Sequence, residues 1–295
     1  MIFTVELENM KTILSSKFEE YEYPTARITS WQPLLGPGIF AVDGPHWQHS
    51  RKVISKAFMR DQVGDVDLFE DHVIRLIDAI PQDGKTTVDL QPLFFDMIMD
   101  SATEFLFGES TDVLSKVKTP ASKRNHDFAE AWDRSQLEVM NGMMLPMYRF
   151  PKQFYADKKV LHEFVDGYVK KGQQFQREWS RNPEKAEAKG SGRYVLMHEL
   201  SKNLDDPKQI RAELLNVLLA SRDTTATLLS NVWWILARYP DVWTKIRKEI
   251  DDIVAPGERP TYDEVKRMTY IKYVCLESKH HQHLSTILPV GCRLY

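Results

Sequence analysis

Hydrophobic residues recur at helical spacing along most of the chain after Gly44. From Asp61 to Ile80 the apolar side chains fall three and four residues apart, which is the spacing of one face of an α-helix. Val88–Phe107 repeats this pattern and is followed directly by Gly108, a residue that commonly ends helices. The pattern therefore predicts a mainly α fold.

Four segments depart from the helical pattern. Near the N-terminus, IFTVEL and LLGPGIFAVDG combine β-prone residues with turn glycines and predict a minor N-terminal β element. The polar stretches 115–126 and 181–193 predict surface loops. Helical patterns of similar character resume after each loop, and no internal repeat is present, so we expect one mostly helical domain rather than a helical array.

The longest helical pattern runs from Asp206 to Pro240. Asp206 suits the N-cap, Pro207 suits the first helical position, and Pro240 ends the pattern. The roughly 30 residues between them would span about 45 Å. A helix that is apolar all round is buried, so we expect this one to run through the middle of the domain. Its apolar residues include Leu214, Leu215, Val217, Leu218, Leu219, Leu228, Leu229, Val232, Trp233 and Ile235.

A polar segment, SRDTT at 221–225, interrupts this apolar helix at its centre. Five consecutive residues sweep past a full helical turn, so some of them must point into the interior. In one interpretation the turn is partly exposed and its hydroxyls bond back to the helix. In the other, the helix opens locally and a small ligand and waters lie beside Asp223 and Thr224.

The composition favours a globular protein without nucleic-acid partners. Hydrophobic residues make up 42% and charged residues 27% of the chain, the formal net charge is −3, and neither end carries a basic arm. Two cysteines are too few for a disulfide framework, which favours a reducing compartment. The sequence contains no apolar run long enough for a membrane span, and its first residues do not resemble a signal peptide.

Trp47 and Arg51 form a second candidate site. Residues four apart share a helix face, so the indole and the guanidinium would lie side by side. The plainer interpretation is a surface cation–π pair.

The SRDTT segment and its surroundings resemble the cytochrome P450 family. AlaSerArgAspThrThr at 220–225 resembles the family's [A/G]-G-x-[D/E]-T-T signature, and Trp47-Gln-His-Ser-Arg51 resembles its W-x-x-x-R motif. TEFLFGES at 103–110 and the stretch after Arg222 are similar to fungal members that hydroxylate alkanes and fatty acids. The resemblance runs from about Ile2 to Glu277, about three fifths of a complete member, and implies a partial cytochrome P450 fold truncated at both ends.

The resemblance implies a role for each matched residue. Asp223 would be the acidic residue and Thr224 the proton-delivering threonine, and the pair could relay protons through water. Ala220 would lie against the haem face, and Trp47 with Arg51 would bind a haem propionate. One departure is Ser221, which stands where the family usually has glycine and could narrow the oxygen groove or add a hydroxyl to it.

The resemblance also implies a cofactor and partners for the complete protein. The cofactor would be haem, electrons would come from an NADPH-dependent reductase, and one oxygen atom of O₂ would enter a C–H bond of a small apolar substrate. Members of this type are endoplasmic-reticulum membrane proteins, but the chain itself carries no anchor that would fix its location.

The resemblance ends near Glu277, which would be the glutamate of the family's E-x-x-R motif. Three residues later stands His280 instead of arginine, so we expect Glu277 to be a solvated carboxylate at a helix end. We therefore divide the chain into a partial cytochrome P450 domain, 1–277, and a divergent tail, 278–295. A retained intron or a shifted reading frame would produce such a tail.

The chain contains no F-x-x-G-x-R-x-C-x-G loop, which supplies the thiolate ligand of the haem iron in this family. Around Cys292 none of the other loop residues matches, and Cys275 lies in a helical pattern as a small apolar residue. We therefore expect no metal ligand in this chain.

Two alternatives stay open. The first is a haem-free, non-catalytic helical protein that binds apolar ligands or partners. The second is a metal-dependent enzyme that uses the histidines of the tail, His280, His281 and His283, although no Cys or carboxylate spacing completes such a site.

Overall fold

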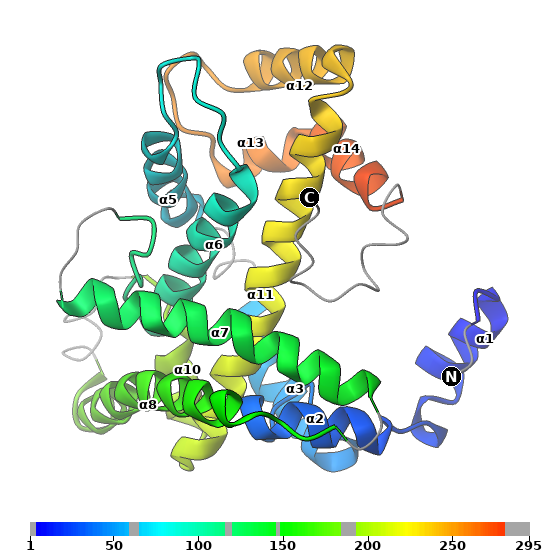
Figure 1. The fold of residues 1–295 in the computed structure, drawn as a ribbon, viewed down its shortest axis with the longest axis vertical. Helices are drawn as coiled ribbons and strands as arrows, with labels where there is room; N and C mark the ends of the chain where they lie inside the picture. The colour runs from blue at the N-terminus through cyan, green and yellow to red at the C-terminus, as the bar shows by residue number, and fades with distance from the viewer. Residues whose placement is uncertain (1–3, 59–64, 116–119, 146–147, 184–192, 281–295) are drawn as a thin grey trace.

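The computed structural model describes residues 4–58, 65–115, 120–145, 148–183 and 193–280, and all regular elements within these ranges are helices. The mainly α prediction is therefore confirmed (Figure 1). The α-helices are α1 Leu7–Lys11, α2 Thr25–Leu35, α3 Gly44–Ser55, α5 Val66–Ala79, α6 Leu90–Phe107, α7 Pro120–Met144, α8 Lys152–Arg181, α10 Leu196–Asn203, α11 Pro207–Leu236, α12 Pro240–Ile253, α13 Tyr262–Arg267 and α14 Thr269–His280. Short helical turns cover Thr12–Ser16, Phe18–Glu20 and Lys56–Phe58.

The predicted N-terminal β element is wrong for the described residues. The end of IFTVEL leads into α1, and the two leucines that begin LLGPGIFAVDG close α2. Side chains take the backbone hydrogen bonds that a strand would use. The Phe40 amide donates to the Asn216 side chain at 2.9 Å, and the Ala41 carbonyl accepts from Gln32 at 3.0 Å.

Two loop predictions have different outcomes. The prediction of a loop over 115–126 is wrong from Pro120 onward, because Pro120 begins α7. Proline suits a first helical position. In 181–193, α8 ends at Arg181, and residues 184–192 lie outside the described ranges.

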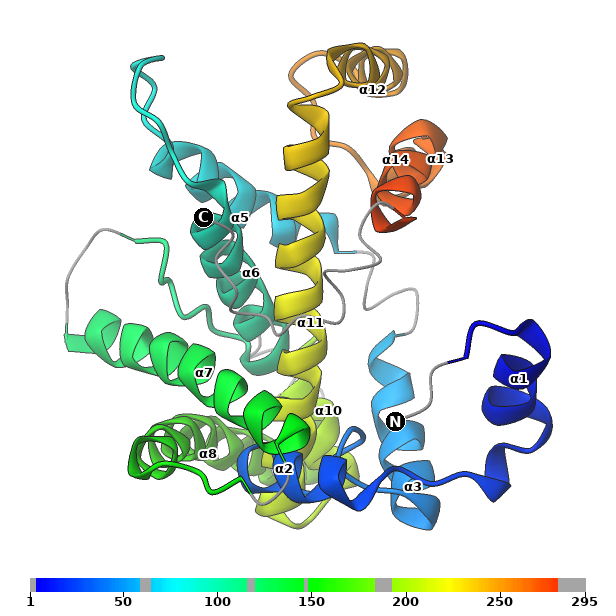
Figure 2. The same cartoon turned by 45° about the vertical axis from the view of Figure 1, so that its right-hand side comes forward.

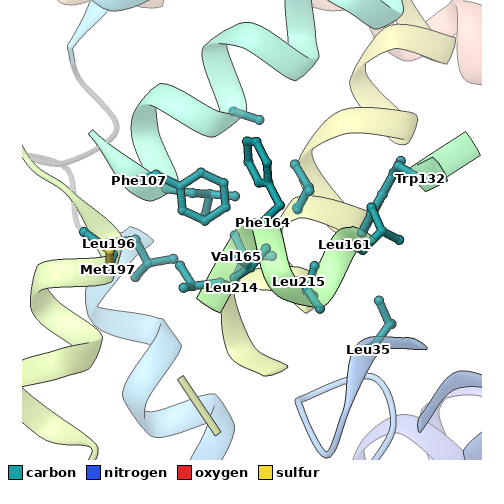
Figure 3. Close-up of a cluster of buried hydrophobic side chains, with 14 of the residues drawn as sticks. Leu35, Phe107, Trp132, Leu161, Phe164, Val165, Leu196, Met197, Leu214 and Leu215 are labelled. Carbon is teal, nitrogen blue, oxygen red and sulfur yellow. The ribbon is translucent and has the colours of Figure 1, made fainter. Parts of the chain in front are cut away.

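The hydrophobic core lies where α6, α7, α8, α10 and α11 meet. Figure 3 shows side chains from all five helices converging there, among them Phe107, Trp132, Phe164, Leu196 and Leu214, each at most 3% exposed. Each such side chain contributes roughly 1.5–3 kcal/mol by leaving water. The core thus holds the first half of α11 rigidly.

The long helix α11 is capped as predicted. The Asp206 side chain accepts a hydrogen bond from the Lys208 amide at 2.9 Å, and Pro207 occupies the first turn. The expectation of burial all round is confirmed for the first half only. Leu214 is fully buried, but Trp233 and Trp234 near the other end are 42% and 60% exposed. Both views show that end of α11 extending beyond α7 and α8 toward α12 (Figures 1 and 2).

Candidate functional site

The charged residues of the SRDTT segment point into the protein. Arg222 is 1% and Asp223 is 3% exposed. One guanidinium nitrogen of Arg222 lies 2.6 Å from Asp133 on α7 and 3.0 Å from Asp223. The guanidinium carbon also lies 5.0 Å from the centre of the Phe95 ring on α6. Arg222 therefore joins α11 to both α6 and α7.

Burial raises the pKa of two carboxyl groups near Arg222. It raises the pKa of Asp223 to about 6, although the neighbouring Arg222 charge lowers it. Burial likewise raises the pKa of Asp96 on α6 to about 6, again against the opposing charge of Arg222. Among the described residues Asp223 Oδ2 has no hydrogen-bond partner. Two carboxyl groups near one guanidinium can thus hold or release a proton close to neutral pH.

The hydroxyl residues of the segment behave differently. Thr224 and Thr225 are exposed, in contrast to the buried Arg222 and Asp223 that directly precede them. The Thr224 hydroxyl donates to the Ala220 carbonyl at 2.6 Å, and the Ser221 hydroxyl donates to the Leu218 carbonyl at 3.2 Å. The hydroxyls bond back to the helix as the first interpretation expects, whereas a ligand beside Asp223 and Thr224 stays a prediction. The Ser221 hydroxyl is satisfied within its own helix.

Trp47 and Arg51 share one face of α3 as predicted. The Asp43 side chain caps this helix by accepting from the Gly44 amide at 3.0 Å. The Arg51 guanidinium lies 5.4 Å from the centre of the Trp47 ring, and the Phe18 ring packs on the indole at 5.3 Å. Arg51 is exposed and forms no ion pair with any of the described residues. The stacking on Trp47 agrees with a surface cation–π pair, and the absence of an ion pair among the described residues leaves the charge available to a ligand.

The two candidate groups lie on neighbouring helices. Figure 2 shows α3 beside the lower part of α11, on the side away from α7, with α14 beside the upper part on that same side. Thr224, two residues after Arg222, projects from roughly the opposite side of α11. The structure does not bring the Thr224 hydroxyl and the Arg51 guanidinium into direct contact.

The comparison with protein families decides the identity of the fold. A model described as "Cytochrome P450" matches residues 1–281. The chain belongs to the cytochrome P450 family.

Individual cytochrome P450 relatives give the same result. The chain is 37% identical over 288 residues to the cytochrome P450 monooxygenase fsdH of Fusarium heterosporum, covering 94% of this chain and 49% of that protein. It is 37% identical over 291 residues to cytochrome P450 52A6 of Candida tropicalis, covering 94% of this chain and 54% of that protein. The chain thus spans about half the length of the curated relatives it matches.

The same architecture is found in solved cytochrome P450 structures. The crystal structure titled "cytochrome P450DA heme domain" superimposes with a TM-score of 0.70 at 20% identity, covering 88% of this chain and 56% of that one. This confirms the expected partial cytochrome P450 fold.

Haem is the cofactor expected of a cytochrome P450, and the described residues fit part of it. The small side chain of Ala220 and the exposed Thr224 leave one face of α11 open to a flat group, and the free Arg51 charge suits a carboxylate at its edge. Of the described residues only Cys275 is a cysteine, half-buried on α14, and no cluster of three His, Cys, Asp or Glu residues could hold a metal. The described residues therefore fit one face and one edge of a haem but form no iron site.

The structure describes only some of the residues on which the C-terminal predictions rest. Glu277 is exposed near the end of α14. However, α14 continues to His280, and Ser278 is 2% exposed, so the helix passes the expected domain boundary. His281, His283 and Cys292 lie outside the described residues.

Sequence reasoning missed the residues that surround the SRDTT segment. Asp96, Asp133 and Gln136 lie on α6 and α7, about 90 or more positions from Asp223, and no local pattern connects them to it. Arg222 carried a usable signal, because a lone cation in an apolar helix requires a buried carboxylate partner.

Proposed function

We propose that the complete protein is a haem-dependent monooxygenase that inserts one oxygen atom of O₂ into a C–H bond of an apolar substrate such as a fatty acid or an alkane. Membership of the cytochrome P450 family supports the reaction class. The similarity of TEFLFGES and of the stretch after Arg222 to fungal alkane and fatty-acid hydroxylases supports the substrate class.

The observation that carries this proposal is the division between Asp223 and Thr224. Asp223 is buried, with a pKa raised to about 6, while the next residue, Thr224, is exposed on the open face of α11. The Thr224 hydroxyl proton is engaged with the Ala220 carbonyl, so its oxygen is free to accept a hydrogen bond from a water. Because its pKa lies within about one unit of neutral pH, Asp223 can take up a proton and pass it through water to the open face.

The remaining residues would hold the cofactor that supplies oxygen activation. Ala220 leaves room against its face, and Arg51 with Trp47 would bind one propionate by a charged and a neutral N–H donor. Arg222 would keep Asp223 in place through their contact of 3.0 Å.

The electron source and location follow as part of the same proposal. Electrons would come from an NADPH-dependent reductase, and the complete protein would lie at the endoplasmic-reticulum membrane, as expected for members of this type. Within the described ranges, no helix combines the length and apolar character needed to cross a bilayer.

We further propose that residues 1–295 alone hold no thiolate-ligated haem, because they contain no F-x-x-G-x-R-x-C-x-G sequence. An iron bound by other ligands would lack the electron donation that promotes O–O cleavage. The chain as printed would then be an inactive piece, which leaves haem-free binding of apolar partners as its alternative role.

The proton relay is tested in the complete protein with Thr224→Ala and Asp223→Asn. Thr224→Ala should divert reduced oxygen to peroxide, since the hydroxyl that orders the water is gone, and Asp223→Asn should slow turnover. Thr224 is exposed, so its variant should keep its stability within about 0.5 kcal/mol. Unchanged coupling of NADPH consumption to product in both variants would contradict the proposed roles.

A further inference from the structure

A buried hydrogen bond connects α3 to α11 at a point that neither proposed role uses. The Ser50 hydroxyl donates to Glu213 Oε1 at 2.5 Å, and the two residues are 1% and 0% exposed. Burial raises the pKa of Glu213, which the Ser50 hydroxyl and the Ile39 backbone amide oppose. Glu213 Oε2 has no hydrogen-bond partner among the described residues. A buried carboxyl group with so few partners is costly, so a specific role is expected of it.

Ser50 lies between the two residues of the proposed propionate site. It follows Trp47 by three positions and directly precedes Arg51 on α3. Residues three apart are neighbours on a helix surface, so a rotation of α3 about Ser50 would move both the indole and the guanidinium. The contact with Glu213 therefore controls the direction in which that pair points.

Among the described residues of Gly44–Ser55, the bond from Ser50 to Glu213 is the only side-chain hydrogen bond to another helix; the Ser55 hydroxyl bonds back to the Lys52 carbonyl at 2.9 Å. At the end of α3, its C-cap residue Lys56 also donates to Asn203 on α10 at 2.9 Å. Val53 and Ile54 are buried beside Ser50 and supply apolar packing on the same helix.

The other side of Glu213 is itself held firmly. One turn further along α11, Asn216 accepts from the Phe40 amide at 2.9 Å and donates to the Ala212 carbonyl at 2.7 Å. The segment before α3 approaches so closely that a Cβ on Gly38 would lie 2.2 Å from the Asn216 side-chain nitrogen. The first half of α11 is thus a fixed frame, and Glu213 connects α3 to it.

We propose that Ser50 and Glu213 are positioning residues for the haem site: their hydrogen bond sets the rotation of α3, so that Arg51 and Trp47 point at a propionate. This inference rests on the proposed function, because it assumes that Arg51 binds the cofactor. It predicts that the effect of losing the bond is transmitted through Arg51.

The test measures the rate of haem loss from the complete, haem-containing protein to excess apomyoglobin, together with the midpoint of urea unfolding. Ser50→Ala should accelerate haem loss about tenfold, since it removes a buried hydrogen bond and leaves Glu213 Oε1 without this partner. Glu213→Met should have a similar effect, whereas Glu213→Gln should stay near wild type because its carbonyl still accepts from Ser50. Ser55→Ala is the matched control, because it removes a hydroxyl from the same helix that does not reach α11.

The double variant Ser50→Ala/Arg51→Ala separates positioning from a merely structural role. Positioning predicts that it loses haem no faster than Arg51→Ala alone, because Ser50 acts through Arg51. The inference would be overturned if the accelerations of haem loss by the two single changes multiply in the double variant, or if Ser50→Ala loses haem at the same rate as Ser55→Ala. Either result would leave the proposed contact between Arg51 and haem standing. A wild-type rate in Arg51→Ala would overturn the proposed haem contact and the inference with it.

Discussion

Replacing Arg222 by leucine should destabilise the protein by an amount that depends on pH. The change removes the guanidinium that lies 3.0 Å from buried Asp223. Breaking a buried ion pair costs about 3–5 kcal/mol if the orphaned carboxylate stays charged. Asp133, the other partner, has a side chain that is 58% exposed, so its lost contact adds about 1 kcal/mol at most.

Protonation of Asp223 sets an upper limit to this contribution, because the carboxyl group can become neutral instead of staying charged without its partner. Its pKa is about 6, so neutralising it at pH 7.5 costs about 2 kcal/mol, at about 1.4 kcal/mol per pKa unit. The lost contact with Phe95 adds about 1 kcal/mol. We therefore expect a loss of about 3 kcal/mol at pH 7.5. At pH 5 the carboxyl group is already protonated, and only about 1 kcal/mol should remain.

The sign of this pH dependence follows from the raised pKa. In the wild-type protein, the contribution of Asp223 to the free energy of unfolding is fully present below the unfolded pKa of 3.8. This contribution is lost as pH rises through the folded pKa of about 6. Without Arg222, which lowers this pKa, the variant continues to lose stability up to a higher pH and therefore loses more in total. The difference between the two proteins therefore opens above pH 6.

Urea unfolding at pH 5 and pH 7.5 measures both values. Arg75→Leu is the matched control, because Arg75 pairs with Asp112 at the same 2.6 Å while both side chains are about half exposed. The control should cost at most about 1 kcal/mol at either pH. The reasoning is refuted if Arg222→Leu costs no more than the control, or if its cost is the same at both pH values.

Two further predictions concern stability. Gly38→Ala should cost about 1–3 kcal/mol because its Cβ would meet Asn216. In the control Gly167→Ala the Cβ would lie 3.4 Å from the end of a flexible arginine, so this change should be neutral or stabilising. Equal thermal midpoints for the two variants would contradict this. Asp100→Ala should cost at least about 3 kcal/mol, since buried Asp100 accepts hydrogen bonds from the Thr111 hydroxyl and the Val113 and Leu114 amides. The control Asp83→Ala, at an exposed carboxylate, should cost far less. Similar urea midpoints for the two variants would contradict the assignment.

The helices that could be predicted are those with both local caps and local spacing. Asp206 and Pro207 fixed the start of α11, and Gly108, with a φ of 77°, marks the end of α6. Periodicity did not reveal which side of a helix faces the core. In α5 the apolar residues Phe69 and Ile77 are 49% and 52% exposed, while Leu68 and His72 are buried. Spacing alone fits either side.

The wrong or missing predictions depend on contacts between distant residues. The N-terminal segment is not a strand because Asn216, 176 positions away, takes the Phe40 amide. The Arg222–Asp133 contact spans 89 positions. For the site, the motifs located Trp47, Arg51, Asp223 and Thr224, but burial and exposure of the last two required the tertiary structure.

The reduced, carbon-monoxide-bound absorption spectrum tests the central claim most directly, that this chain forms one face of a haem-thiolate site and lacks its iron ligand. The spectrum is recorded with haem supplied to residues 1–295 and to the complete protein that includes the family's cysteine loop. We predict a stoichiometric thiolate-type Soret band for the complete protein and none for residues 1–295. A clean thiolate band from residues 1–295, or no such band from the complete protein, would contradict the account.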